Sequence, residues 1–217
     1  MNKFLLAAAG LLAATSAQAV TVTLGAGNVG ISAITVTVTG TTIEIEETWT
    51  SAAPGSLQIS GLAAGVDYEI RKTIINNTGV TITRLANELL DPAGQANDAL
   101  DPTPAPSFVP AGFTTSNDGD GLSFAQGSGL PRDSTIWSTV VADELTDARD
   151  FLDFFSGSLA DGASGLVRFS IRDNVGDPGD NQPFLLFQRP NASSVPTPAA
   201  IGLFGLGLAL LAARRRG

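Results

Sequence analysis

Two short acidic loops carry the side chains best suited to bind a ligand. One is residues 117–121, Asn-Asp-Gly-Asp-Gly, and the other is residues 173–180. Both place carboxylate and amide oxygens on short side chains, beside turn residues that let several oxygens converge. Calcium is a hard cation that takes about six to eight oxygen ligands. The sequence therefore predicts calcium ligands at Asp118, Asp120, Asp173, Asp177 and Asp180.

The same loops have a second interpretation as ordinary turns. Neither matches an EF-hand: with Asp118 and Asp120 at loop positions three and five, Gly127 would fall at the bidentate position. Asp, Asn and Gly are also the residues that turns favour. Calcium binding and simple turn formation both stay open, and a melting curve with calcium and with EDTA separates them.

The residue types for common catalytic mechanisms are scarce. The chain has neither histidine nor cysteine, so the commonest general base and the usual nucleophilic thiol are both missing. Lys72 is the one lysine left once the N-terminal segment is removed, and no Gly-x-Ser-x-Gly elbow occurs. We therefore expect a non-enzymatic protein that needs no cofactor, apart from the calcium considered above.

A glycosidase could instead use paired carboxylates, and Glu44, Glu46 and Glu47 are the nearest candidates. Glu44 and Glu46 alternate with Ile43 and Ile45, which favours the solvated face of a strand. A carboxylate hydrolase, with its site in the 91–132 segment, is the least favoured hypothesis.

Most of the chain alternates apolar and polar residues with period two, which is typical of half-buried strands. Gly40-Thr41 separates two such runs and predicts a hairpin turn. The fold class expected is all-β, an antiparallel β-sandwich of the jelly-roll or Ig-like kind. The expected strands are residues 20–24, 34–38, 43–45, 57–59, 66–75, 80–85, 134–141, 165–172 and 183–188.

Two segments break this rhythm. Residues 91–132 are rich in proline and glycine and predict a long loop or insertion. Residues 141–155 space their apolar side chains helically and predict one short helix, with Gly157 as its stop.

The first 19 residues have the pattern of a signal peptide. Lys3 is followed by an apolar core over residues 4–14, and Ala17 and Ala19 frame a small-x-small cleavage site. Export is therefore predicted, with residues 20–190 as one exported domain. This domain has 8 basic residues, which is the chain's 12 less Lys3 and the three tail arginines, and it has 21 acidic residues. Its net charge is therefore −13, and no nucleic-acid partner is expected.

The last 23 residues have three parts. A linker starts at residue 191 and leads into a short motif, Val195, Pro196, Thr197, Pro198 and Ala199. An apolar transmembrane segment follows over residues 199–213. Residues 214–217 are a basic cytoplasmic tail, in which Arg214, Arg215 and Arg216 stop translocation. This order resembles the PEP-CTERM sorting signal of Gram-negative bacteria, in its Val-Pro-x-Pro-Ala variant. The apolar run is shorter than the roughly 20 residues of a comfortable membrane span, which suits a removable signal.

The resemblance implies processing by an exosortase-type protease. The precursor would then lie in the inner membrane and the mature protein at the cell surface or in the extracellular matrix. An alternative is an exopolysaccharide-binding module that uses Trp49, Tyr68 or Trp137, although so few aromatic rings are also typical of core packing.

Overall fold

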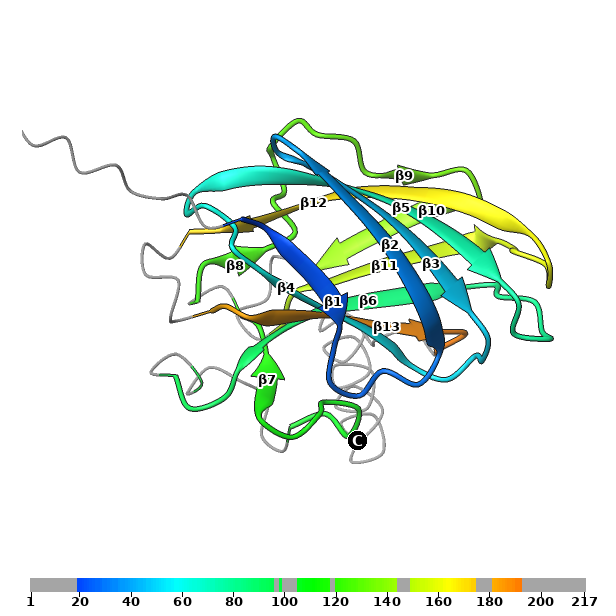
Figure 1. Cartoon of the computed structure of the whole chain (residues 1–217), viewed down its shortest axis with the longest axis horizontal. Helices are drawn as coiled ribbons and strands as arrows, with labels where there is room; N and C mark the ends of the chain where they lie inside the picture. The colour runs from blue at the N-terminus through cyan, green and yellow to red at the C-terminus, as the bar shows by residue number, and fades with distance from the viewer. Residues whose placement is uncertain are drawn as a thin grey trace, which may run out of the picture.

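The computed structural model describes residues 19–95, 98, 105–117, 120–143, 149–174 and 181–192. These residues form thirteen strands in two sheets, so the all-β prediction is confirmed (Figure 1). The expected signal peptide, sorting motif, transmembrane segment and basic tail lie outside them, except for Ala19. Within the described ranges, no helix has the length and apolar character needed to cross a membrane.

The first sheet has the strand order β1-β4-β13-β6-β11-β10, with β7 paired to β6. Its strands are β1 (Thr21–Leu24), β4 (Gly55–Ser60), β6 (Leu85–Pro92), β7 (Phe113–Thr115), β10 (Trp137–Asp143), β11 (Phe151–Gly157) and β13 (Phe184–Pro190). The second sheet has the order β2-β3-β5-β12-β8, with β9 paired to β12. Its strands are β2 (Ile31–Thr39), β3 (Thr42–Trp49), β5 (Val66–Asn76), β8 (Leu122–Ser123), β9 (Asp133–Ser134) and β12 (Ser164–Asp173).

The pairing is mixed rather than wholly antiparallel. β3 and β5 run parallel, with Ile43 opposite Ile70 and Ile45 opposite Lys72. The chain leaves β3, passes through β4 in the first sheet, and returns to the second sheet as β5. This crossover brings β5 back in the direction of β3, so the expectation of purely antiparallel sheets is wrong at this one pair.

One hydrophobic core lies between the sheets and takes side chains from both. Alternation on β3 and β5 points Ile43, Trp49 and Ile70 into it. Glycine makes room for the largest of these side chains: a Cβ at Gly30 or Gly55 would overlap the Trp49 ring. The side chains of the two sheets therefore pack closely around Trp49.

The predicted hairpin at Gly40 is confirmed. β2 and β3 pair in register around it, and Gly40 has φ of +58°, a conformation that glycine adopts without steric cost. Strands also occupy the segments expected at 20–24, 57–59, 66–75, 165–172 and 183–188, with bounds shifted by a few residues.

The short helix predicted over residues 141–155 is wrong. Residues 141–143 end β10 and residues 151–155 belong to β11, and the two strands pair antiparallel, with Val140 opposite Phe154. Residues 144–148 lie outside the described ranges. Phe151, Leu152 and Phe154 are all buried, so β11 carries large apolar side chains on both faces. That double burial produced a spacing that resembled a helix.

The strand predicted at residues 80–85 is also misplaced. Ile82 makes an isolated bridge with Leu159, and the regular strand β6 starts only at Leu85. β6 lies inside the first sheet with both faces covered, and its buried residues include Asn87, Glu88 and Asp91. Because these buried side chains are polar, β6 lacks the apolar–polar alternation by which the other strands were predicted.

The long loop predicted at residues 91–132 is only partly a loop. It contains β7 and β8, and its residues Phe108, Val109 and Phe113 pack on a small second core. That second core is formed by Leu90, Leu185 and Phe187 on the outer face of the first sheet. The insertion therefore covers a sheet face that would otherwise expose large apolar side chains.

Candidate binding groove and acidic loops

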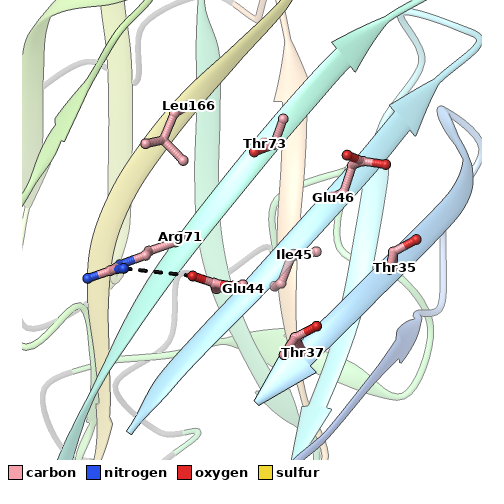
Figure 2. A pocket seen from close by; sticks show the side chains of 8 residues that line it. All are labelled: Thr35, Thr37, Glu44, Ile45, Glu46, Arg71, Thr73 and Leu166. Carbon is pink, nitrogen blue, oxygen red and sulfur yellow. Dashed lines mark ion pairs between the residues drawn. The ribbon is translucent and has the colours of Figure 1, made fainter. Parts of the chain in front are cut away.

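A shallow polar groove of about 440 Å³ crosses the outer face of the second sheet (Figure 2). Four strands, β2, β3, β5 and β12, contribute to it side by side. Its lining residues are Thr35, Thr37, Glu44, Ile45, Glu46, Arg71, Thr73 and Leu166.

Strand alternation and register place these residues together. On β3, Glu44 and Glu46 face outward, whereas Ile43, Ile45 and Glu47 are buried. The pairing sets Thr37 opposite Glu44 on β2 and Arg71 opposite Glu44 on β5, which makes one polar row across three strands. A second row joins the residues Thr35, Glu46, Thr73 and Leu166.

Arg71 organises the charges at one end of the groove. Its Nε and Nη2 donate to the two carboxylate oxygens of Glu69 at 2.9 and 3.0 Å. Its Nη1 lies 3.7 Å from Oε1 of Glu44, the ion pair that Figure 2 marks. Hydrogen bonding to Glu69 raises the pKa of Arg71 above its ordinary value, with the charges of Glu69 and Glu44 adding to the effect. The groove therefore offers hydroxyl, carboxylate and guanidinium groups to a polar ligand.

The three carboxylates considered for glycosidase chemistry do not share a site. Glu44 and Glu46 lie on the exposed face, and Glu47 points into the core. Adjacent strand residues face opposite sides of a sheet, so Glu47 cannot act with either neighbour.

The aromatic rings considered for glycan stacking lie inside the protein. Trp49, Tyr68 and Trp137 are 0%, 6% and 1% exposed. The Trp49 indole N–H donates to Glu47 at 3.0 Å, and the Tyr68 hydroxyl accepts from the backbone N–H of Ala63. Their interpretation as core residues is confirmed, and none of the three can present a ring to a sugar.

The structure brings the two acidic loops together. β8 pairs with the end of β12, setting Leu122 opposite Asp173, and the Asn174 N–H donates to the Gly121 carbonyl at 2.9 Å. The Asn181 amide bridges the loops, donating to the Asp120 carbonyl at 2.6 Å and to Asp173 Oδ1 at 3.1 Å. Nothing in the local sequence pattern indicated that these loops are neighbours.

The two described carboxylates act as acceptors for protein groups. Asp120 accepts from the backbone N–H of Asn117 at 2.9 Å and of Leu122 at 2.8 Å. Asp173 accepts from the side-chain amides of Asn181 and Gln182, the latter at 2.8 Å. These contacts suit turn residues that tie strands together better than an open calcium site.

The remaining predicted ligands, Asp118, Asp177 and Asp180, lie outside the described residues. Among the residues that are described, no group of three or more acidic, histidine or cysteine side chains is arranged to hold a metal ion. Calcium binding by the five predicted aspartates therefore stays a prediction.

The predicted processing residues fall mostly beyond the described part. Ala17, the motif at residues 195–199 and the arginines at 214–216 lie outside it. Ala19 is exposed, and it lies two residues before Thr21, where β1 starts.

Sequence reasoning missed a polar cluster in the core: Lys72, Glu47 and Gln188 are fully buried between the sheets. It also missed Glu88, which is buried and paired with Arg149 and Arg189. A signal for the first cluster existed. Lys72 follows Tyr68 and Ile70 at alternate positions, and Gln188 follows Phe184 and Leu186 in the same way, so both were due to face inward.

Comparison of the chain with protein-family models, with curated proteins and with solved structures finds no match.

Proposed function

We propose that the chain is an exported, non-enzymatic protein of the cell surface or extracellular matrix, sorted through its PEP-CTERM-like C-terminal signal. The observation that carries the proposal is where the fold lies relative to the two processing signals. β1 starts at Thr21, two residues after Ala19, and β13 ends at Pro190, five residues before Val195. Cleavage at both signals would leave all thirteen strands intact.

The use of the charged side chains supports a structural role. Arg172 pairs with Asp67 and Arg168 with Asp133, each through two hydrogen bonds of 2.6–2.8 Å. Buried Glu88 accepts from Arg149 at 2.5 and 2.7 Å. Each of these carboxylates orients an arginine that holds neighbouring strands or loops.

Within the β-sandwich class, we propose a jelly roll for the region from β4 to β13. From β4 onward the chain crosses repeatedly between the sheets: β5, β8, β9 and β12 lie in the second, whereas β4, β6, β7, β10, β11 and β13 lie in the first. An Ig-like sandwich has fewer such crossings. The short strands β8 and β9 share one edge of β12.

The sorting proposal is tested by removing the extended entry to the apolar segment. In the double variant Pro196→Ala, Pro198→Ala, residues before the segment can become helical, and the motif read by the protease is lost. We expect the precursor to accumulate in the inner-membrane fraction, and an immunoblot of that fraction measures it. The matched control is Ser193→Ala, Ser194→Ala, beside the motif, which should mature normally. Normal maturation of the proline variant would contradict the proposal.

A second candidate function is exopolysaccharide binding, favoured by the groove of Figure 2. Its threonine hydroxyls, glutamates and Arg71 can hydrogen-bond a sugar, although none of the described residues that line it is aromatic. A glycan array with the mature protein would test this. Thr37→Ala with Glu46→Ala should abolish a true signal, and Thr23→Ala, exposed on β1, should not. Binding that survives the groove variant would place the glycan site elsewhere.

A further inference from the structure

Three polar side chains meet in the centre of the sandwich. Lys72 on β5 and Glu47 on β3 reach in from the second sheet, and Gln188 on β13 reaches in from the first. All three are 0% exposed. A lysine so placed carries a large desolvation cost unless its charge is paired or removed.

Each of the three side chains contacts the other two. The Lys72 ammonium nitrogen Nζ contacts Oε1 of Gln188. Gln188 Nε2 donates to Oε1 of Glu47 at 2.7 Å, and Oε2 of Glu47 lies 3.6 Å from Lys72 Nζ. One carboxyl group therefore touches the carboxamide nitrogen and faces the lysine nitrogen.

The surroundings favour a neutral amine. Burial lowers the pKa of Lys72 from its ordinary value, although the charge of Glu47 acts in the opposite direction. The Phe169 ring centroid 5.9 Å from Nζ and the indole N–H that Trp49 donates to Glu47 also favour the charged forms, so desolvation is the factor that favours the neutral amine. Proton transfer from Lys72 to Glu47 would give an uncharged amine and a carboxylic acid without leaving a net charge in the core.

We propose that Lys72 and Gln188 form an intramolecular isopeptide bond, with Glu47 carrying the protons. The Nζ lone pair attacks the side-chain carbonyl carbon of Gln188, and a new C–N bond forms. The bond from that carbon to Nε2 breaks. Glu47 gives a proton to the departing nitrogen and receives the one that Nζ loses, so the products are one amide and one ammonia. No oxidant or reductant takes part.

Gln188 is preferred over Asn87 as the acceptor, although Asn87 Oδ1 also lies 3.4 Å from Lys72 Nζ. The Asn87 amide nitrogen donates to the backbone carbonyls of Leu85 and Leu152, at 3.3 and 3.0 Å. It therefore has no carboxyl group to protonate it as it leaves. The Gln188 nitrogen has Glu47 in direct contact.

The bond would link the two sheets covalently. Lys72 and Gln188 are 116 residues apart in the chain, and they lie on β5 and β13, which are inner strands of the two different sheets. A chain without cysteine cannot make disulfides, so this amide would supply the cross-link that many exported domains obtain by oxidation.

Mass spectrometry of the purified wild-type protein tests the proposal without relying on a variant that must fold. The intact mass should be lower, by the mass of one ammonia, than the mass calculated for the sequence between the two measured termini. Trypsin should fail to cleave after Lys72, and the digest should contain one branched peptide joining Lys72 to Gln188. Separate peptides with unmodified Lys72 and Gln188 would overturn the bond, and a branch to Asn87 would overturn the choice of acceptor.

Variants test the role of Glu47. Glu47→Gln should restore the full mass, as Lys72→Met should, while Asn87→Ala should keep the loss of ammonia. A Glu47→Gln protein that still loses ammonia would contradict proton transfer by this residue. Circular dichroism of each variant identifies any that fail to fold, and the wild-type peptide map decides the question in that case.

Discussion

Lys72 shows how one residue can set the chemistry of a core. Its neighbours on β5 are apolar at alternate positions, and the fold gives it Glu47, Asn87 and Gln188 as polar partners. Removing one partner of such a buried set leaves a polar group unsatisfied in the core, which is more costly than losing an exposed ion pair. The outer-face pair of Arg71 and Glu44 is of the second, weaker kind.

A pH series distinguishes a free Lys72 amine from a cross-linked one. In Gln188→Met the amine stays free, with its pKa lowered by burial, and Glu47 on β3 is the charged group facing it. Between that lowered pKa and a pH of about 10.4, the folded pair of Lys72 and Glu47 has lost a proton that the unfolded Lys72 still holds, so the unfolding free energy rises with pH over this interval. We expect this rise in the variant and a smaller slope in the wild type, measured by urea unfolding. Equal slopes would contradict the cross-link.

Asp173 is expected to stabilise the fold with or without calcium. In Asp173→Ala the amides of Asn181 and Gln182 lose an acceptor in a buried site, which should cost about 1–3 kcal/mol of unfolding free energy. Exposed Glu46→Ala is the control and should change it by less than about 0.5 kcal/mol. Melting curves in EDTA and in calcium should show the same loss. A loss seen only with calcium would show that Asp173 is a metal ligand.

For single residues, the sequence predicted the placement of those side chains whose position depends on their neighbours along the chain. Glu44 and Glu46 were expected on a solvated face because their isoleucine neighbours define the other face, and they lie there. The meeting of Asp120 with Asp173, and of Lys72 with Gln188, depends on pairings between distant strands. Such contacts follow from the topology, which local patterns do not encode.

Two strands that were not predicted from the sequence, β6 and β11, are buried on both faces. β6 and β11 are neighbours inside the first sheet, and each has large or polar side chains on both sides. Period-two alternation requires one solvated face, so it detected β3 and missed β6. The same double burial gave residues 151–155 their misleading helical spacing.

The 105–117 segment is expected to stabilise the first sheet through Phe108. Its half-buried ring stacks on Phe187 with centroids 5.8 Å apart and lies 3.8 Å from the guanidinium carbon of Arg189. Phe108→Ala should lower the unfolding free energy by about 2 kcal/mol, because it removes the apolar contact and the cation–π contact together.

Val29→Ala serves as the control for that experiment, since Val29 is 66% exposed. Chemical denaturation of both variants gives the comparison. Equal unfolding free energies for Phe108→Ala and Val29→Ala would mean that the contacts of Phe108 do not stabilise the first sheet.

The described residues form a β-sandwich in which several arginines pair with carboxylates of neighbouring strands or loops. Arg84 pairs with Asp153, and Arg172 with Asp67 across paired strands. The sequence predicted the all-β class because most strands keep one polar face. It did not predict the parallel β3–β5 pair, which depends on how the chain crosses between the sheets.

The central claim, an exported sandwich trimmed at both ends, is tested most directly by top-down mass spectrometry of the protein from its native cells. We predict a mature chain that starts at Val20, directly after Ala19, and ends before the apolar segment at residues 199–213. It would then retain β1 to β13 and lack Arg214, Arg215 and Arg216. A mature protein that still carries the three arginines would contradict the account.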